Sequence, residues 1–166
     1  VAEIGVKVIF ATITGIDNTG SSTEWDIERK ARLSKLCRQY ENLDVHEDSI
    51  LEGYNILHDK AGVKRRKNVP SSENLIKMLL KNQDIPFINQ VVDIYNVISM
   101  ESRFCVAAHN LDKVEGNLTV RFSDGTEIYL PLGAEQPVPV KPHEYCYCDD
   151  SNEVLCRLEI RQVEKT

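Results

Sequence analysis

The sequence predicts an α+β fold, in which helices and strands occupy separate parts of the chain. Apolar residues at helical spacing dominate residues 22–99, whereas the stretch after residue 103 contains short β-rich runs separated by turn residues. The chain has 166 residues, of which 42% are hydrophobic and 28% charged, as is typical of one globular domain. We therefore expect a single domain over residues 1–166 and leave open whether residues are missing at either end, because the chain begins with Val.

Four helices are predicted in the first hundred residues. We expect them at about residues 22–40, 46–60, 72–81 and 87–99. Ser21 and Glu24 have the spacing of a capping box and mark the start of the first helix. Ser71 or Ser72 is expected to cap the third helix, and Pro86 to open the fourth.

Strands are predicted on both sides of the helical region, from alternating or β-branched runs bounded by turn residues. We expect them at residues 4–14, 104–108, 117–123, 126–131, 143–148 and 153–161. Asp124-Gly125 is a strong two-residue hairpin signal and is expected to join the run at 117–123 to the run at 126–131. Residues 150–152 are expected to join the last two strands in a second hairpin.

The fourth predicted helix carries an unusual polar stripe. Asn89, Asp93 and Asn96 recur at positions i, i+4 and i+7 within a strongly apolar segment. On a helix this spacing places the three side chains on one face. Short polar groups on a largely buried helix need hydrogen-bond partners, either inside the protein or in a ligand. The spacing alone is compatible with a structural hydrogen-bond network and with a ligand pocket.

A basic cluster follows the second predicted helix. Lys60, Lys64, Arg65, Arg66 and Lys67 place five positive charges within eight residues of a chain whose net charge is -6. Clustered cations neutralise backbone phosphates and make nucleic-acid binding depend on salt. The alternative is a solvated loop on an acidic protein. No aromatic residue lies within the cluster, so the sequence gives no support for base stacking there.

The five cysteines suggest reduced thiols in the cytoplasm, because their number is odd and no secretory signal precedes them. A zinc site would use Cys146, Cys148 and Cys156, with His143 as a fourth ligand, and a three-residue loop would place Cys156 opposite Cys146. The Cys-x-Cys spacing is shorter than that of common zinc sites. We therefore expect buried cysteines, with no metal and no cofactor. No apolar run approaches the length of a membrane helix, so no membrane contact is expected.

Several motifs, in order, resemble a known family. Ile88-Asn89 followed by Val92-Asp93-Ile94-Tyr95-Asn96 resembles the I-N-x-V-V-D-x-x-N signature of the tRNA-binding and editing domain (B3/B4 domain) of the phenylalanyl-tRNA synthetase beta subunit. Leu111 to Arg121 is similar to its D-K-x-x-G-x-I-x-V-R stretch, and Tyr147-Cys148-Asp149-Asp150 continues the order. Small free-standing proteins built around this domain resemble the chain further, for example in Gly62-Val63-Lys64.

The resemblance implies an α+β fold with a mixed β-sandwich-like core and helices packed on one side. It implies binding of aminoacyl-tRNA and, in the synthetase, hydrolysis of tyrosine wrongly attached to phenylalanine tRNA. We expect catalytic roles for Asn96, Asp93 and His109, pocket positions for Asn89, Tyr95 and Ala107, and RNA contacts from Lys64, Arg65, Arg66 and Lys67.

One departure from the family pattern concerns the synthetase's pocket histidine, whose position is Ala107 in this chain. His109 lies two residues further on. If this segment is a strand, the two positions share a face and His109 is expected to substitute in part.

Two functions therefore stay open. The first is an aminoacyl-tRNA binding protein that edits mischarged tRNA in trans. The second is a non-catalytic module that binds a small amino-acid-like ligand, RNA or a protein partner, which the net charge of -6 and Ala107 favour. Whether the chain is an enzyme is left open, and DNA is not an expected partner.

Overall fold

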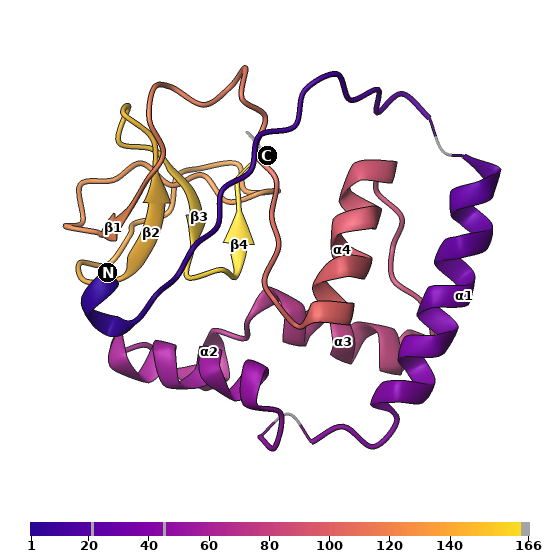
Figure 1. The fold of residues 1–166 in the computed structure, drawn as a ribbon. Helices are drawn as coiled ribbons and strands as arrows, with labels where there is room; N and C mark the ends of the chain where they lie inside the picture. Colours follow the sequence, from indigo (N-terminus) through magenta and orange to yellow (C-terminus); the bar gives the residue numbers. More distant parts are fainter. Residues whose placement is uncertain (21, 45, 164–166) are drawn as a thin grey trace. The chain divides into compact units, whose positions relative to one another are not determined.

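The computed structural model describes residues 1–20, 22–44 and 46–163 (Figure 1). Its α-helices are α1 (Thr23–Tyr40), α2 (Ser49–Lys60), α3 (Ser71–Asn82) and α4 (Gln90–Ser102). Its strands are β1 (Thr119–Phe122), β2 (Tyr145–Cys148), β3 (Val154–Arg157) and β4 (Arg161–Gln162). The strands form one antiparallel sheet in the order β1-β2-β3-β4. All helices precede all strands in the described chain, which confirms the α+β class.

The four predicted helices are confirmed, with shifted starts. α1 is capped by Ser22, whose hydroxyl accepts a hydrogen bond from the Trp25 amide at 3.0 Å. Ser21, the expected cap, lies outside the described residues. α4 begins after Asn89 and not after Pro86, because the Asn89 side chain accepts from the Val92 amide at 2.9 Å and so fixes the first turn.

The strand predictions are confirmed only in part. β2 and β3 form the expected hairpin, but β1 pairs with β2 and not with residues 126–131. The hairpin predicted around Asp124-Gly125 is therefore wrong. The Glu127 carboxylate accepts from the amides of Asp124 and Gly125 at 2.9 Å, which folds this turn onto its own side chain. Residues 126–131 make only two isolated bridges in the described chain.

The strands predicted at residues 4–14 and 104–108 are wrong as well. Ala2–Ile4 forms a short 3-10 helix, and no strand is assigned in residues 5–14 or 104–108. An alternating pattern has the side chains of a strand, but a strand also needs a neighbouring strand with which its backbone can form hydrogen bonds. The strands of the described residues form one four-stranded sheet.

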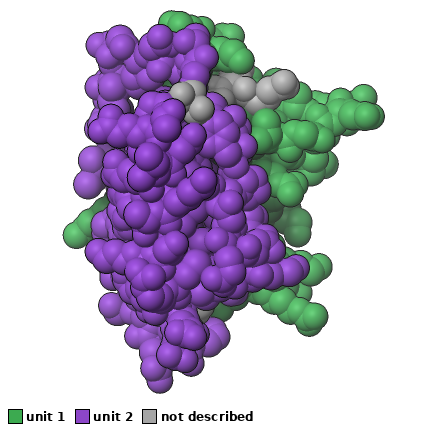
Figure 2. Space-filling view, turned by 90° about the vertical axis from the view of Figure 1, so that its right-hand side faces the viewer, with its two compact units in different colours: residues 1–7, 53–71, 107–166 green, residues 8–52, 72–106 purple. Residues whose placement is uncertain are grey.

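The chain clusters into two compact units, coloured green and purple in Figure 2. Unit 1 comprises Val1–Lys7, Gly53–Ser71 and Ala107–Thr166, and unit 2 comprises Val8–Glu52 and Ser72–Val106. The sheet lies in unit 1, whereas α1 and α4 lie in unit 2.

The sheet of unit 1 is buried on both faces. Successive residues of β2 point to opposite sides, so side chains of this strand contribute to both faces. On one side, Cys146 and Cys148 join a buried cluster formed with Tyr129, Val140, Val154, Leu155 and Val163. On the other side, Tyr145 packs with Val63 and Leu158. This explains why all four residues of β2 are buried.

Unit 2 is built around α1 and α4, which lie side by side (Figure 1). Its buried apolar residues are Trp25, Leu33, Leu36, Tyr40, Leu51, Ile76, Leu79, Ile85, Val97 and Met100. The Tyr40 hydroxyl donates to the Met100 carbonyl at 2.6 Å and ties the last turns of the two helices together.

Two residues of the family motifs brace a loop in unit 1. The Asp150 carboxylate accepts from the backbone and side-chain amides of Asn117 at 2.9 and 3.1 Å. Gly116 has a φ of +69°, and a Cβ atom at this position would lie 2.1 Å from the Asp150 carboxylate. The glycine is thus required both by backbone conformation and by space.

We expect Gly116→Ala to lower the free energy of unfolding by about 3 kcal/mol, because it combines left-handed strain with a clash against Asp150. Gly133→Ala is the matched control: its φ is +79° and nothing lies within 4 Å of the added atom, so only the strain of about 1 kcal/mol remains. Chemical denaturation measures both. Equal losses would show that the clash is relieved without cost.

Candidate functional site

Asp93 is fully buried and joins α4 to α1. Trp25 Nε1 donates to its Oδ2 at 2.8 Å, and Arg29 Nε donates to its Oδ1 at 2.9 Å. Arg29 is buried too and forms a second ion pair with Asp84 at 2.9 Å. Burial disfavours the charged guanidinium, but the hydrogen bond to Asp93 and the two carboxylate charges hold the pKa of Arg29 above its usual value. Both Asp93 oxygens therefore already have donors from α1.

The other members of the polar stripe behave differently. Asn89 uses its side-chain oxygen to cap α4. Asn96, half-buried one turn after Asp93, makes no side-chain hydrogen bond to the described residues. Tyr95 is half-buried, and burial raises the pKa of its hydroxyl. Of the three stripe residues, Asn96 is thus the one whose amide is left for a ligand.

Ala107 and His109 belong to unit 1, whereas Asn89, Asp93 and Asn96 belong to unit 2. Ala107 is exposed and His109 half-buried. Residues 104–108 form no strand, so strand geometry does not place positions 107 and 109 on one face.

His109 nevertheless has a distinctive environment. Its Nδ1 atom is buried and has no hydrogen-bond partner among the described residues. Burial also lowers the pKa of the ring, which favours the neutral imidazole near pH 7. The preceding backbone is held by Gln162 of β4, which donates to the Ala108 carbonyl at 3.2 Å. A buried imidazole nitrogen without a partner is a candidate for contact with a ligand.

The basic cluster lies around a short 3-10 helix, Arg65–Lys67, in unit 1. Lys64, Arg66 and Lys67 are exposed and form no ion pair with a described residue. Arg65 is engaged: its guanidinium lies 2.5 Å from the Asp59 carboxylate, and this hydrogen bond lowers the pKa of Asp59. Three of the four predicted RNA contacts are therefore available to phosphates.

The cysteines do not converge on one site. In the β2–β3 register, Cys156 lies opposite Tyr147 and not opposite Cys146, as the sequence suggested. Directly opposed residues share a face, so Cys156 points away from the face of Cys146 and Cys148. Among the described residues, no group of three or more His, Cys, Asp or Glu side chains is placed to hold a metal ion.

A hollow of about 560 Å³ lies elsewhere in unit 2, lined among others by Glu41, Asp44, Glu73 and Lys77. None of the predicted site residues lines it. Its carboxylates outnumber its single lysine, so it is a poor receptor for phosphate.

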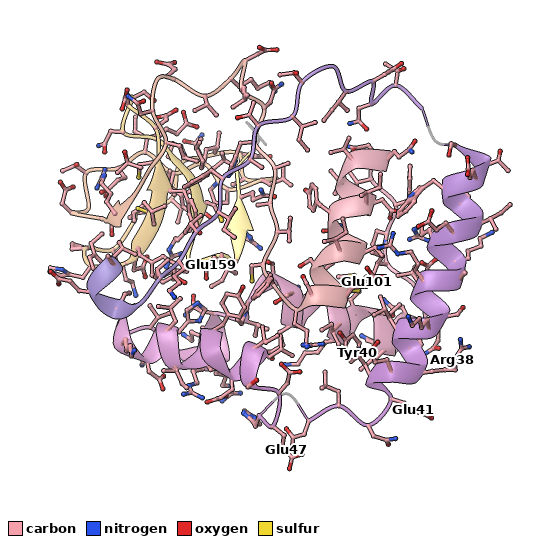
Figure 3. The ribbon with its side chains drawn as sticks, viewed as in Figure 1. Arg38, Tyr40, Glu41, Glu47, Glu101 and Glu159 are labelled. Atoms are coloured by element: carbon pink, nitrogen blue, oxygen red, sulfur yellow. The ribbon has the colours of Figure 1, made fainter. Side chains whose placement is uncertain are left out.

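Sequence reasoning missed a polar cluster at the end of β3. The hydroxyl of Tyr145 donates to the Glu159 carboxylate at 2.6 Å, and that of Tyr147 lies within 3.4 Å of it. Leu158 and Glu159 both adopt positive φ, which turns the Glu159 side chain (labelled in Figure 3) toward β2. Burial raises the pKa of this carboxyl. No spacing in the sequence predicts the cluster, because only the turn after β3 brings these residues together.

A raised pKa in the folded state means that this carboxyl stabilises the fold fully below its unfolded pKa, and that the contribution is lost as pH rises through the folded pKa. We expect Glu159→Gln to be more stable than the unmodified chain at pH 7, with the difference shrinking toward pH 4. Thermal unfolding across this range measures it. A difference independent of pH would show that ionisation of Glu159 is not responsible.

We expect Asp93→Asn to lower the free energy of unfolding by about 3 kcal/mol, because the buried Arg29 loses its buried charged partner and keeps only the exposed Asp84. Glu101→Gln is the control, since the Arg32–Glu101 pair also joins α1 to α4 but is exposed, and its loss should cost at most about 1 kcal/mol. Urea denaturation of both variants checks this. A similar small loss in both would refute a bracing role for Asp93.

Comparison with known proteins places most of the chain in one family. The family model of the B3/4 domain, the domain of the phenylalanyl-tRNA synthetase beta subunit, matches residues 60–166. The curated proteins contain no match, and neither do the solved structures. No helix in the described ranges is long and apolar enough to cross a membrane. The match covers more than half of the chain, and the chain therefore belongs to the B3/4 domain family.

Proposed function

We propose that this chain binds aminoacyl-tRNA and hydrolyses mischarged aminoacyl-tRNA in trans. The observation that carries the proposal is the family match, which links the chain to tRNA-synthetase-related, nucleic-acid-binding proteins. Two structural features support the finer function: the three available cations of the basic cluster and the open amide of Asn96.

The basic cluster is proposed to contact tRNA phosphates. Val63, which directly precedes it, is buried and donates its amide to the His58 carbonyl of α2 at 2.8 Å, so the cations follow an anchored residue. Arg65 is proposed to stiffen the loop through Asp59 while Lys64, Arg66 and Lys67 meet phosphates. Outside the cluster the chain is acidic, so it repels phosphates there and favours their binding at the cluster.

Replacing Lys64, Arg66 and Lys67 together by Gln should weaken tRNA binding at low salt and reduce the slope of log affinity against log salt by about 2 to 3. The matched control replaces Lys30, Lys35 and Arg38, three exposed cations of α1, which changes net charge equally. Filter binding at several salt concentrations measures both. Equal effects would assign the binding to net charge and not to the loop.

Asn96 of unit 2 is proposed to position the ester, and His109 of unit 1 is proposed separately as a general base. An aminoacyl ester is activated, so positioning a polarised water supplies much of what hydrolysis needs. A neutral imidazole is the form that accepts a proton. Asp93, with both oxygens occupied, is proposed to act as a positioning residue that fixes α4 against α1 and so holds Asn96. Asn89 holds the start of the same helix, and Tyr95 is proposed to line the pocket with Asn96.

Hydrolysis of tyrosine-charged phenylalanine tRNA is the direct test. We expect turnover by the unmodified chain, lowered about hundredfold by Asn96→Ala and by His109→Ala, with tRNA binding unchanged. Ile98→Ala, at an exposed position of α4, serves as control. Unchanged turnover in both variants would show that other residues catalyse the hydrolysis.

The second candidate is a non-catalytic module that binds tRNA or an amino-acid-like ligand. Ala107 in place of the synthetase's histidine, and an Asp93 carboxylate already engaged by Trp25 and Arg29, favour it. It predicts salt-dependent tRNA binding without turnover on any mischarged tRNA.

The proposal extends to the finer structural assignments. We propose a single domain over residues 1–166 with the fold of the synthetase editing domain, acting in the cytoplasm. The family match over residues 60–166 supports the fold assignment.

A further inference from the structure

Cys146 and Cys148 form a close pair of thiols on one face of the sheet. Their sulfur atoms lie 3.4 Å apart, and both residues are almost completely buried. They occupy positions i and i+2 of β2, so both side chains point to the same side of the strand. No other part of the proposed function uses them.

Charged residues stand beside the pair on this face. Arg121 of β1 and Arg157 of β3 lie directly opposite Cys146 in the two ladders, so their side chains leave the sheet on its side. Arg121 pairs with Glu127 at 2.5 Å, and Arg157 donates to Glu144 at 2.5 and 2.6 Å. Each guanidinium is thus held in place by a carboxylate, and the positive and negative charges beside the sulfurs are balanced.

The rest of this face is apolar, through Tyr129, Val140 and Leu155. Two adjacent buried sulfurs, with no third metal ligand grouped with them among the described residues, suit a soft ion that is stable with two thiolates. The extended backbone of β2 disfavours a disulfide, because residues i and i+2 of a strand are about 6.6 Å apart, near the upper limit for a bridged pair.

We propose that Cys146 and Cys148 bind one soft monovalent metal ion, with Cu(I) as the fitting chemistry. Both thiols lose their protons to solvent, two sulfur–copper bonds form, and no electron is transferred. The complex carries one net negative charge, and the cations on its side of the sheet are Arg121 and Arg157, each of which is also paired with a carboxylate.

The test is an anaerobic titration of the reduced full chain with Cu(I) held by bicinchoninate. Cys37→Ser and Cys105→Ser are present throughout, because these half-buried thiols would also compete for copper. We expect one equivalent of copper to move to the protein, with native mass spectrometry giving a single bound ion.

Cys148→Ser should weaken copper binding at least tenfold, and Cys148→Ala serves if the serine variant does not fold. Cys156→Ser is the matched control, because Cys156 is equally buried in the neighbouring strand but faces the other side of the sheet. It should bind copper as the parent does. The proposal is overturned if the parent leaves copper with bicinchoninate, or if loss of Cys156 weakens binding as much as loss of Cys148.

Discussion

The arrangement of unit 2 depends on one buried ion pair. Asp93 of α4 has no solvent exposure, and its two oxygens meet Arg29 and Trp25 of α1. Two charges removed from water stabilise a fold little in absolute terms, but each becomes costly if the other is lost. The pair therefore fixes which turn of α4 faces which turn of α1. Asn96 lies one turn further along α4, so its position follows from this pairing.

Carboxylates also hold the turns of unit 1, where they accept hydrogen bonds from backbone amides. Glu127 closes the Asp124-Gly125 turn, Asp149 accepts from Ser151 and Glu153, and Asp150 holds the loop at Gly116. Several residues that carry the family resemblance are thus architectural. A family signature in this domain consequently indicates the fold more directly than it indicates catalysis.

The chemistry proposed for this chain relies on groups that the architecture leaves without partners. Asn96, the buried Nδ1 of His109 and the exposed cations at 64, 66 and 67 make no hydrogen bond or ion pair with the described residues. Asn96 follows from the stripe spacing and from the resemblance, whereas the isolation of His109 Nδ1 is visible only in the structure. The Cys146–Cys148 pair is not among these groups and lies on a buried face of the sheet.

The sequence by itself determined the α+β class, the four helices, the β2–β3 hairpin and the family, because each rests on local periodicity, turn chemistry or ordered motifs. It placed strands wrongly at 4–14, 104–108 and 126–131, because alternation describes side chains and not the ladder that a strand must join. Only the tertiary structure decided what the stripe residues do. Residues of one helical stripe have three different roles: Asn89 caps its own helix, Asp93 forms an ion pair that packing brings to it, and Asn96 makes no bond to the described residues. The Glu159 cluster and the separation of Cys156 from the other two thiols likewise depend on register and on the turn at Leu158, which no spacing in the chain encodes.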